Sequence, residues 1–317
     1  MLRYLLRPPI VRPSRAVPGS NMRVSEDLRR CVVFLGIEEG TRATFIGTGF
    51  LLVYKHIRYL VTVKHVALAL DDTPFIIRMN GVDEKEPHNI RVDPVTDRVK
   101  WYSHDDQDVD LAVLPFHFNL KQVGIDFLSV PEELVADAAR IASEQIGTGD
   151  DCYTVGLFRL LAGRKRNLPV VHTGNIALLP KDERIPVKNW ETANPKAAKT
   201  RHVEGYLVQS QSLQGLSGSP VFVRPSVDVD FTAIVDGVLA KLPRPHLYLL
   251  GVWQGAWDAP AYEVLAADRG RDLRVPVGMG VVVPAYKLVE VFESKDLRED
   301  REERLKRIEA AKAAKLD

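Results

Sequence analysis

The stretch QSLQGLSGSPVFV, residues 211–223, surrounds Ser217 with small residues and then enters an apolar run. Glycine lets the backbone turn sharply and lets other groups approach it closely, so the stretch is suited to presenting its own main-chain N–H groups. Pro220 and the β-branched residues after it favour a strand. We therefore expect a tight turn that presents Ser217, with a plain turn between strands as the simpler alternative.

The composition is that of a folded globular protein. The 317 residues are 45% hydrophobic, which is enough for a core and suits two domains or subdomains. The 43 lysines and arginines nearly balance the 42 acidic residues, and the net charge is +1. Such a balance gives no general attraction to nucleic acid or to an anionic membrane, so we expect neither as a partner.

Cysteine usage and hydropathy both bear on the compartment. Cys31 and Cys152 lie far apart in apolar runs, which favours small buried side chains over a disulfide framework or a metal site and fits a reducing compartment. The sequence lacks the roughly 18 continuous apolar residues that a membrane span needs. The start, MLRYLLRPPI, is interrupted by Arg7 and two prolines before a signal-peptide core forms. We therefore expect a cytoplasmic protein.

The first 25 residues carry five arginines and no acid. A basic segment of this kind is typical of a transit peptide, but its four prolines disfavour the amphipathic helix that a transit peptide needs. We expect a disordered tail or a true start at Met22, with a transit peptide as the remaining alternative.

Short runs rich in Val, Ile, Leu, Phe and Thr, separated by Gly, Pro and Asp, fill most of the chain from Cys31 onward. This spacing is typical of an all-β barrel or sandwich. The runs form two sets, and the helix-favouring stretch PEELVADAARIASEQIG lies between them. After Pro284 the chain is dense in charge, has a helix-forming composition, and offers Leu288, Val291 and Phe292 for docking.

A serine hydroxyl is a weak nucleophile at neutral pH, so it needs a base that is itself held by a third group. LVTVKHVA places His65 where an apolar strand ends, and DVDLAVL places Asp110 at the start of another. A carboxylate that opens a buried strand can be shielded from water and still accept a hydrogen bond from an imidazole. His65, Asp110 and Ser217 are therefore the candidate catalytic residues.

Each of these signals is weak when taken alone. A histidine at a strand end is more often structural, and an aspartate before an apolar strand is commonly a turn or cap residue. Asp108 competes with Asp110 because it lies one strand period away. The hypothesis depends on the combination of the three residues.

Together these motifs resemble those of the chymotrypsin-fold, trypsin-like serine endopeptidases. LVTVKHVA looks like the histidine motif, DLAVL is similar to the aspartate motif and GLSGSPVF resembles the nucleophile loop, in the chain order His, Asp, Ser. The resemblance covers about residues 30–292. Many members have glycine at the position of Ser219, and a serine there resembles the bacterial glutamyl-endopeptidase branch. The VVVP ending resembles the bacterial high-temperature-requirement proteases.

The resemblance implies an all-β fold of two six-stranded antiparallel β-barrels followed by a C-terminal α-helix. We accordingly expect five units along the chain. They are a tail at 1–25, an N-terminal barrel at 26–125, a linker at 126–145, a C-terminal barrel at 146–285 and a charged helix at 286–317.

The resemblance also implies roles for single residues. Ser217 is the nucleophile, His65 is the general base and then the acid, and Asp110 fixes the imidazole tautomer. The N–H groups of Gly215 and Ser217 form the oxyanion hole, and Gly218 permits the turn. The residues expected to line the substrate pocket are Gln211, Ser212, Gln214, Trp253, Gln254 and Gly255.

Two features refine this expectation. The predicted pocket floor at Gln211 carries no charge, which disfavours a strong preference for Lys or Arg, and Trp253 is either a pocket wall or a core residue. Leu216 stands where the secreted digestive members have an aspartate that pairs with a newly cut N-terminus. Activation through that ion pair is therefore not expected.

The leading function is a serine endopeptidase that cuts a protein or peptide through an acyl-enzyme. One alternative is a catalytically silent protease-fold module that binds a peptide or protein, although the full set of Ser, His and Asp argues against it. A second is an α/β-hydrolase esterase, which needs glycine two residues after the nucleophile and then a helix, whereas Ser219 and a strand follow here.

No cofactor or metal is expected. His172, His202 and His246 lack metal-ligand spacing with cysteine or acid, and the glycines form no phosphate-binding loop or dinucleotide fingerprint. The charged C-terminal helix is a candidate surface for docking a partner.

Overall fold

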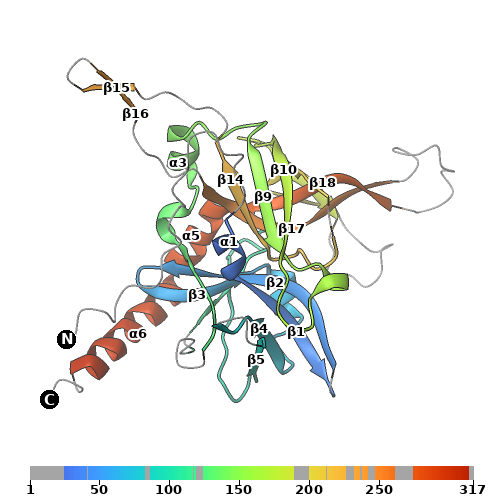
Figure 1. Cartoon of the computed structure of the whole chain (residues 1–317), viewed down its shortest axis with the longest axis vertical. Helices are drawn as coiled ribbons and strands as arrows, with labels where there is room; N and C mark the ends of the chain where they lie inside the picture. Colours follow the sequence, from blue (N-terminus) through green and yellow to red (C-terminus); the bar gives the residue numbers. More distant parts are fainter. Residues whose placement is uncertain are drawn as a thin grey trace.

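The computed structural model describes residues 25–40, 42–82, 86–116, 118, 124–188, 200–211, 213–225, 232–235, 238–241, 247–260 and 274–313. Apart from Ser25, the predicted tail lies outside these residues. The fold is mostly β, with an N-terminal sheet, a C-terminal barrel and two helices at the end of the chain (Figure 1). The all-β class predicted from the sequence is confirmed, whereas the predicted division into five units stays a prediction.

The N-terminal sheet has eight strands. Seven lie in the order β5-β4-β1-β2-β3-β7-β6, and β8 pairs in parallel with β2. The strands are β1 (Val32–Glu39), β2 (Arg42–Tyr54), β3 (Ile57–Thr62), β4 (Phe75–Met79), β5 (His88–Val92), β6 (Tyr102–Ser103), β7 (Ala112–Pro115) and β8 (Val130–Pro131).

This half differs from the predicted six-stranded barrel, because β5 and β6 end the sheet without pairing with each other among the described residues. The segment between them is a turn in which the Asp93 carboxylate accepts hydrogen bonds from the N–H groups of Val95 and Thr96. Strand β6, which follows, has two residues. Too little extended backbone is available here to close the sheet.

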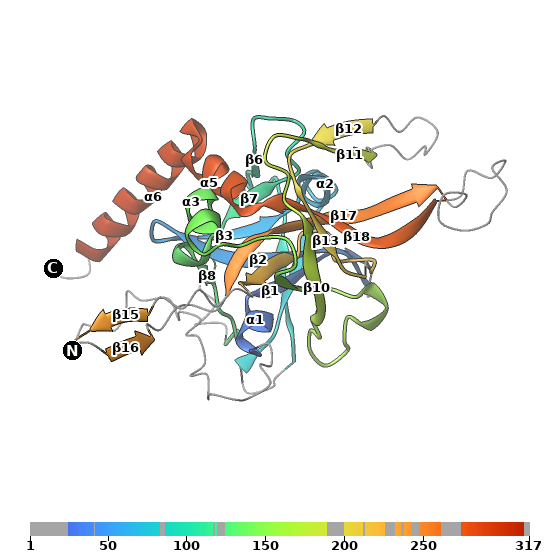
Figure 2. The same ribbon diagram turned by 90° about the horizontal axis from the view of Figure 1, so that it is seen from above.

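The C-terminal half is a closed barrel of six antiparallel strands in the order β10-β13-β18-β17-β14-β9, as the resemblance implied. Its strands are β9 (Asp151–Gly156), β10 (Val170–Leu178), β13 (Tyr206–Gln209), β14 (Pro220–Arg224), β17 (Tyr248–Pro260) and β18 (Arg274–Pro284). Strands β17 and β18 continue past the barrel as a two-stranded ribbon (Figures 1 and 2).

Two hairpins pair outside the sheet and the barrel. They are β11 (Ile185–Lys188) with β12 (Thr200–Val203), and β15 (Thr232–Val235) with β16 (Val238–Lys241). Short helical segments connect the strands. These are α1 (Asp27–Arg30), α2 (Lys64–Leu68), η2 (Glu132–Leu134), α3 (Ala138–Ser143) and η3 (Arg159–Leu161).

One apolar core joins the two halves. Phe50, Leu51 and Leu52 of β2 are all fully buried, so both faces of this strand are covered and it reads as a continuous apolar run. The same cluster includes Phe222 of β14 and Phe292 near the chain end. Residues at the seam between sheet and barrel are therefore held by packing from both sides.

The chain ends in two helices, α5 (Ala285–Glu293) and α6 (Lys295–Ala313), whereas one helix was expected. Ser294 interrupts them with an extended ψ of 148°. Leu288, Val291 and Phe292 are buried, as the sequence predicted. Helix α6 then runs outward from the body (Figures 1 and 2). No helix among the described residues combines the length and the apolar character that crossing a bilayer requires.

The two cysteines are buried and unbonded to each other, as expected. Cys31 is 0% exposed and Cys152 is 1% exposed. Burial raises the pKa of the Cys31 thiol to about 12, so this side chain stays protonated and acts as a small apolar residue.

Candidate active site

His65 and Asp110 meet through two contacts. His65 is the second residue of α2, directly after β3, and Asp110 lies just before β7. One carboxylate oxygen accepts the His65 main-chain N–H at 3.0 Å, and the other lies 2.7 Å from Nδ1. Asp110 is 8% exposed. An ionised carboxylate in this position makes Nδ1 the protonated ring nitrogen and Nε2 the acceptor.

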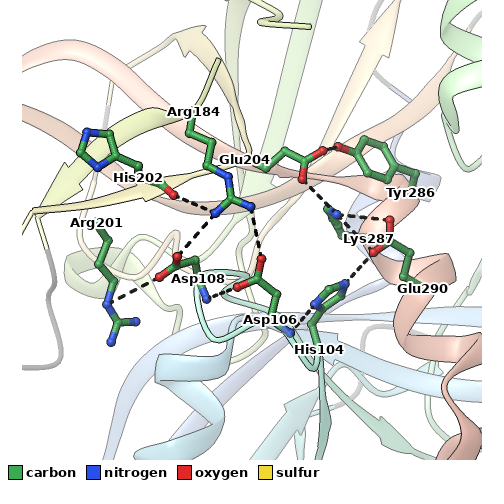
Figure 3. Close-up of polar contacts among 10 residues, drawn as sticks. All are labelled: His104, Asp106, Asp108, Arg184, Arg201, His202, Glu204, Tyr286, Lys287 and Glu290. Atoms are coloured by element: carbon green, nitrogen blue, oxygen red, sulfur yellow. Dashed lines mark hydrogen bonds and ion pairs between the residues drawn. The ribbon is translucent and has the colours of Figure 1, made fainter. Parts of the chain in front are cut away.

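Asp108, the competitor, points elsewhere. Its carboxylate lies 3.6 Å from Arg184, which directly precedes β11, and 3.9 Å from Arg201 of β12 (Figure 3). Arg184 also lies 3.6 Å from Asp106. The segment before Asp110 is therefore tied to the C-terminal half by ion pairs, and the imidazole is contacted by Asp110.

The same segment is tied to α5 on its other side. His104 Nε2 lies 2.7 Å from Glu290, whose carboxylate also binds Lys287 at 3.2 Å. Lys287 lies 3.0 Å from Glu204, which accepts a hydrogen bond from the Tyr286 hydroxyl (Figure 3). Burial opposes ionisation of Glu204, but the bonds from Tyr286 and Lys287 prevail and hold its pKa below the ordinary value. We call the residues of Figure 3 the charged network.

Thr48 on β2 holds the turn before and after Ser217. Its main-chain N–H donates to the Ser217 carbonyl at 2.9 Å, and its hydroxyl donates to the Gly215 carbonyl at 2.7 Å. The same hydroxyl accepts the Leu157 N–H at 2.9 Å. Thr48 is 0% exposed. One buried side chain of the N-terminal sheet thus connects Leu157, the residue after β9, to the Ser217 turn.

The two remaining carbonyls of the turn are also occupied. The N–H of Arg159 donates to the Gln214 carbonyl at 3.0 Å, and the N–H of Ser219 donates to the Leu216 carbonyl at 2.8 Å. Each carbonyl from 214 to 217 therefore has a donor, and the four peptide planes that they belong to are fixed.

Fixed peptide planes determine where two N–H groups point. All described peptide bonds are trans, and in a trans peptide the C=O and the next N–H are antiparallel. The N–H groups of Gly215 and Ser217 therefore point away from the groups that hold the carbonyls of Gln214 and Leu216. Among the described residues neither of these N–H groups donates to a backbone carbonyl.

The glycines permit this backbone. Gly215 has φ +104° and Gly218 has φ +88°, in the region that side chains rarely adopt. A Cβ on Gly218 would also lie closer than 3.0 Å to Thr48 O and Thr62 Oγ1. The turn is therefore packed tightly against β2 and against the end of β3, three residues before His65.

Gly47 brings the turn close to α2. A Cβ on Gly47 would lie 2.8 Å from Val66 Cγ2 and 3.2 Å from the Ser217 carbonyl oxygen, so the neighbour of His65 and the main chain of Ser217 contact the same residue. The Ser217 hydroxyl donates to the Gln254 carbonyl at 3.3 Å.

The residues predicted to line a pocket lie in different environments. Gln211 and Gln214 are exposed, Gly255 is half-buried and Ser212 lies outside the described residues. Gln254 is 3% exposed, and its Oε1 has no partner among the described groups. Their part in a pocket stays a prediction.

Trp253 is a core residue. It is 1% exposed, it belongs to the apolar cluster of the C-terminal barrel, and its ring fills the space over Gly280. Leu216 is 0% exposed and lies in the same cluster, where an aspartate would need a buried partner. Among the described residues no three His, Cys, Asp or Glu side chains are grouped to hold a metal ion.

Sequence reasoning missed Thr48 and Arg159. A signal for Thr48 exists, because it is a polar residue between two glycines in a mostly apolar strand. Arg159 contributes its main-chain N–H, which any residue other than proline supplies, so the sequence carries no signal for it.

No protein-family model and no curated protein matches the sequence. Among solved structures, the Rv3671c protease in its inactive form is 18% identical, with 84% of this chain and 88% of that chain covered and a TM-score of 0.40. The inactive serine-to-alanine mutant of Rv3671c from M. tuberculosis H37Rv is 17% identical, with 84% of this chain and 87% of that chain covered and a TM-score of 0.39. The active form of the Rv3671c protease from M. tuberculosis is 17% identical, with 84% of this chain and 80% of that chain covered and a TM-score of 0.42. At values this low, any function has to be argued from the residues of this chain.

Proposed function

We propose that the protein is a serine endopeptidase that hydrolyses peptide bonds through an acyl-enzyme on Ser217. The observation that carries the proposal is the double contact of Asp110 with His65, because it fixes both the place and the tautomer of the ring. The proposal includes a relation to the bacterial trypsin-like peptidases, which the resemblance at Ser219 implied. It also includes a cytoplasmic location, which is supported by two buried cysteines that form no disulfide with each other.

The chemistry follows from the arrangement. His65 Nε2 takes the Ser217 hydroxyl proton as Oγ forms a bond to the substrate carbonyl carbon, and the carbonyl oxygen becomes an oxyanion. The N–H groups of Gly215 and Ser217 stabilise that oxyanion, and each such donor contributes about 3 kcal/mol in related sites. The imidazolium then protonates the leaving amine, the C–N bond breaks, and water hydrolyses the ester by the reverse proton path.

One rearrangement is required before attack. In the structure the Ser217 hydroxyl donates to the Gln254 carbonyl at 3.3 Å, so its O–H has to turn from that carbonyl to His65 before the proton can be transferred. Catalytic hydrogen bonds are often loose in unliganded enzymes and tighten with substrate. A contact of this length costs little to break.

The direct test is labelling with a fluorophosphonate probe. The wild-type protein should acquire one adduct, located on Ser217 by mass spectrometry, and Ser217→Ala should acquire none. Ser103→Ala, at an exposed serine of β6, is the matched control and should label like wild type. A folded wild-type protein that resists the probe at every pH between 6 and 9 would contradict the proposal.

The second candidate is a catalytically silent module that binds a peptide or protein. The bond from Ser217 to Gln254 favours it, because a hydroxyl held there permanently never reaches the base. This candidate predicts peptide binding that survives Ser217→Ala, together with no hydrolysis by wild type. Docking of a partner on α6 is a separate proposal that either function accommodates.

A further inference from the structure

The segment that joins β9 to β10 (Figure 1) contacts the turn that contains Ser217. We call residues 157–169, LFRLLAGRKRNLP, the basic loop, because it contains four cationic residues and no acid. Its residue Arg159 donates the hydrogen bond that holds the Gln214 carbonyl. A Cβ on Gly215 would lie 2.9 Å from the side chains of Arg159 and Leu157.

The basic loop is held in place at its far end. Asn167 is 2% exposed, its N–H donates to Asn80 Oδ1 at 2.6 Å and its Nδ2 donates to the Arg78 carbonyl at 2.7 Å. Arg78 in turn donates to the Arg164 carbonyl at 2.9 Å. The loop therefore bridges the barrel and strand β4 of the sheet, which preorganises it for binding.

The side chains that the basic loop presents are unusual for a surface. Leu160 is 85% exposed and Leu161 is 51% exposed, next to each other in the chain. Arg159, Arg164 and Lys165 are exposed, and none of them forms an ion pair within the part of the chain that the structure describes. Apolar and positive surface thus lie together beside the turn.

The position of the basic loop indicates which half of a bound peptide it would contact. The Ser217 hydroxyl contacts Gln254 of β17, whereas Gly215 contacts Leu157 and Arg159. Three of the six residues predicted to line the substrate pocket, Trp253, Gln254 and Gly255, lie on β17. With the residue before the cut on that side of Ser217, the residues after the cut extend toward Leu157 and Arg159, at about 3.3 Å per residue.

We propose that the basic loop binds the substrate segment that follows the scissile bond and selects acidic side chains with an apolar neighbour there. This inference rests on the proposed peptidase function, since it assigns the orientation of the substrate. The carboxylates of the substrate pair with Arg164 and Lys165, and the apolar side chain covers Leu160 and Leu161.

The test measures binding and cutting separately. Two fluorescent peptides share the half before the cut and carry either Glu-Leu-Glu or Lys-Leu-Lys directly after it, and their binding to Ser217→Ala is followed by anisotropy. The acidic peptide should bind at least about tenfold more tightly, and added salt should weaken it, as expected for a few exposed ion pairs. Arg164→Glu with Lys165→Glu should abolish the difference.

The matched control is Arg298→Glu with Lys306→Glu, which makes the same charge change on exposed positions of α6 and should keep the preference. Equal binding of the two peptides to Ser217→Ala overturns the inference, and the peptidase proposal stands if wild type still takes the fluorophosphonate. Absence of labelling overturns the peptidase proposal, whatever the peptides do. Vesicles of anionic lipid form a third arm, and binding to them through Leu160 and Leu161 without peptide discrimination also overturns the inference.

Discussion

Thr48→Val removes one buried hydroxyl and keeps the shape of the side chain. The hydroxyl donates to the Gly215 carbonyl at 2.7 Å and accepts the Leu157 N–H at 2.9 Å, so both groups lose their partner. Leaving a buried polar group unsatisfied costs about 1–3 kcal/mol, and we expect a loss of stability in that range for the Leu157 N–H alone. The peptide plane between Gly215 and Leu216 also loses its anchor.

The effect on catalysis is expected to appear mainly in kcat. Removing an oxyanion donor costs about 3 kcal/mol, or about 100-fold, and Thr48 holds the plane between the two donor planes rather than a donor itself. We therefore expect kcat on a peptide substrate to fall about 10- to 100-fold, with KM changed less. Thr48→Ser keeps the hydroxyl and should stay near the wild-type rate while losing about 1 kcal/mol of stability for the methyl group.

Thr154→Val is the matched control. Thr154 on β9 is 1% exposed, and its hydroxyl has no partner among the described groups, so this substitution should leave rate and stability unchanged or raise stability. Urea unfolding and steady-state kinetics on the three variants give the comparison. The reasoning is refuted if Thr48→Val and Thr154→Val behave alike.

Asp110→Asn should lower kcat by about 10⁴-fold, because the amide favours the wrong tautomer of His65. Asp108→Asn should keep a kcat near that of wild type. Equal kcat values for the two variants in a peptidase assay would refute the assignment of Asp110. Gly218→Ala should lower the free energy of unfolding in urea by about 2–4 kcal/mol, because the new Cβ would collide with Thr48 and Thr62. Gly149→Ala is the control, since Gly149 has φ +99° but open space around it and so shows the cost of φ alone. Equal losses of stability in the two variants would refute the packing argument. The pKa of Glu204 is lowered from 4.5, so its contribution to stability is present above that pH and is lost as the pH falls through the lowered pKa. The difference in Tm between wild type and Glu204→Gln should therefore shrink below pH 4.5. A difference in Tm that does not depend on pH would contradict the role given to the charged network.

The sequence predicted the parts of the fold that strong local patterns specify. The apolar runs of the C-terminal half are long, and they form the closed barrel. Closure of the N-terminal sheet depends on β6, whose two residues carry no period that distinguishes them from a loop. The break at Ser294 was missed because neither proline nor glycine marks it, although serine is a common N-cap residue.

In the candidate site, too, the residues with a strong local pattern were predicted and those that depend on tertiary packing were not. His65 and Asp110 were found because a titratable residue at the edge of an apolar strand is conspicuous, and the structure joins them. The donors that fix the Ser217 turn come from Thr48 and from the Arg159 main chain, which contact it only in the folded chain. Pairings of this kind follow from tertiary packing rather than from local pattern. Of the two, only Thr48 leaves a trace in the sequence, as a polar residue between two glycines.

Hydrolysis of an unbiased peptide library, with the new termini identified by mass spectrometry, tests the central claim most directly. Wild type should cut internal peptide bonds, and the purified Ser217→Ala and His65→Ala proteins should produce no new termini at the same sites. A Ser217→Ala protein that cuts as wild type does, or a folded wild-type protein that cuts nothing, would contradict the account.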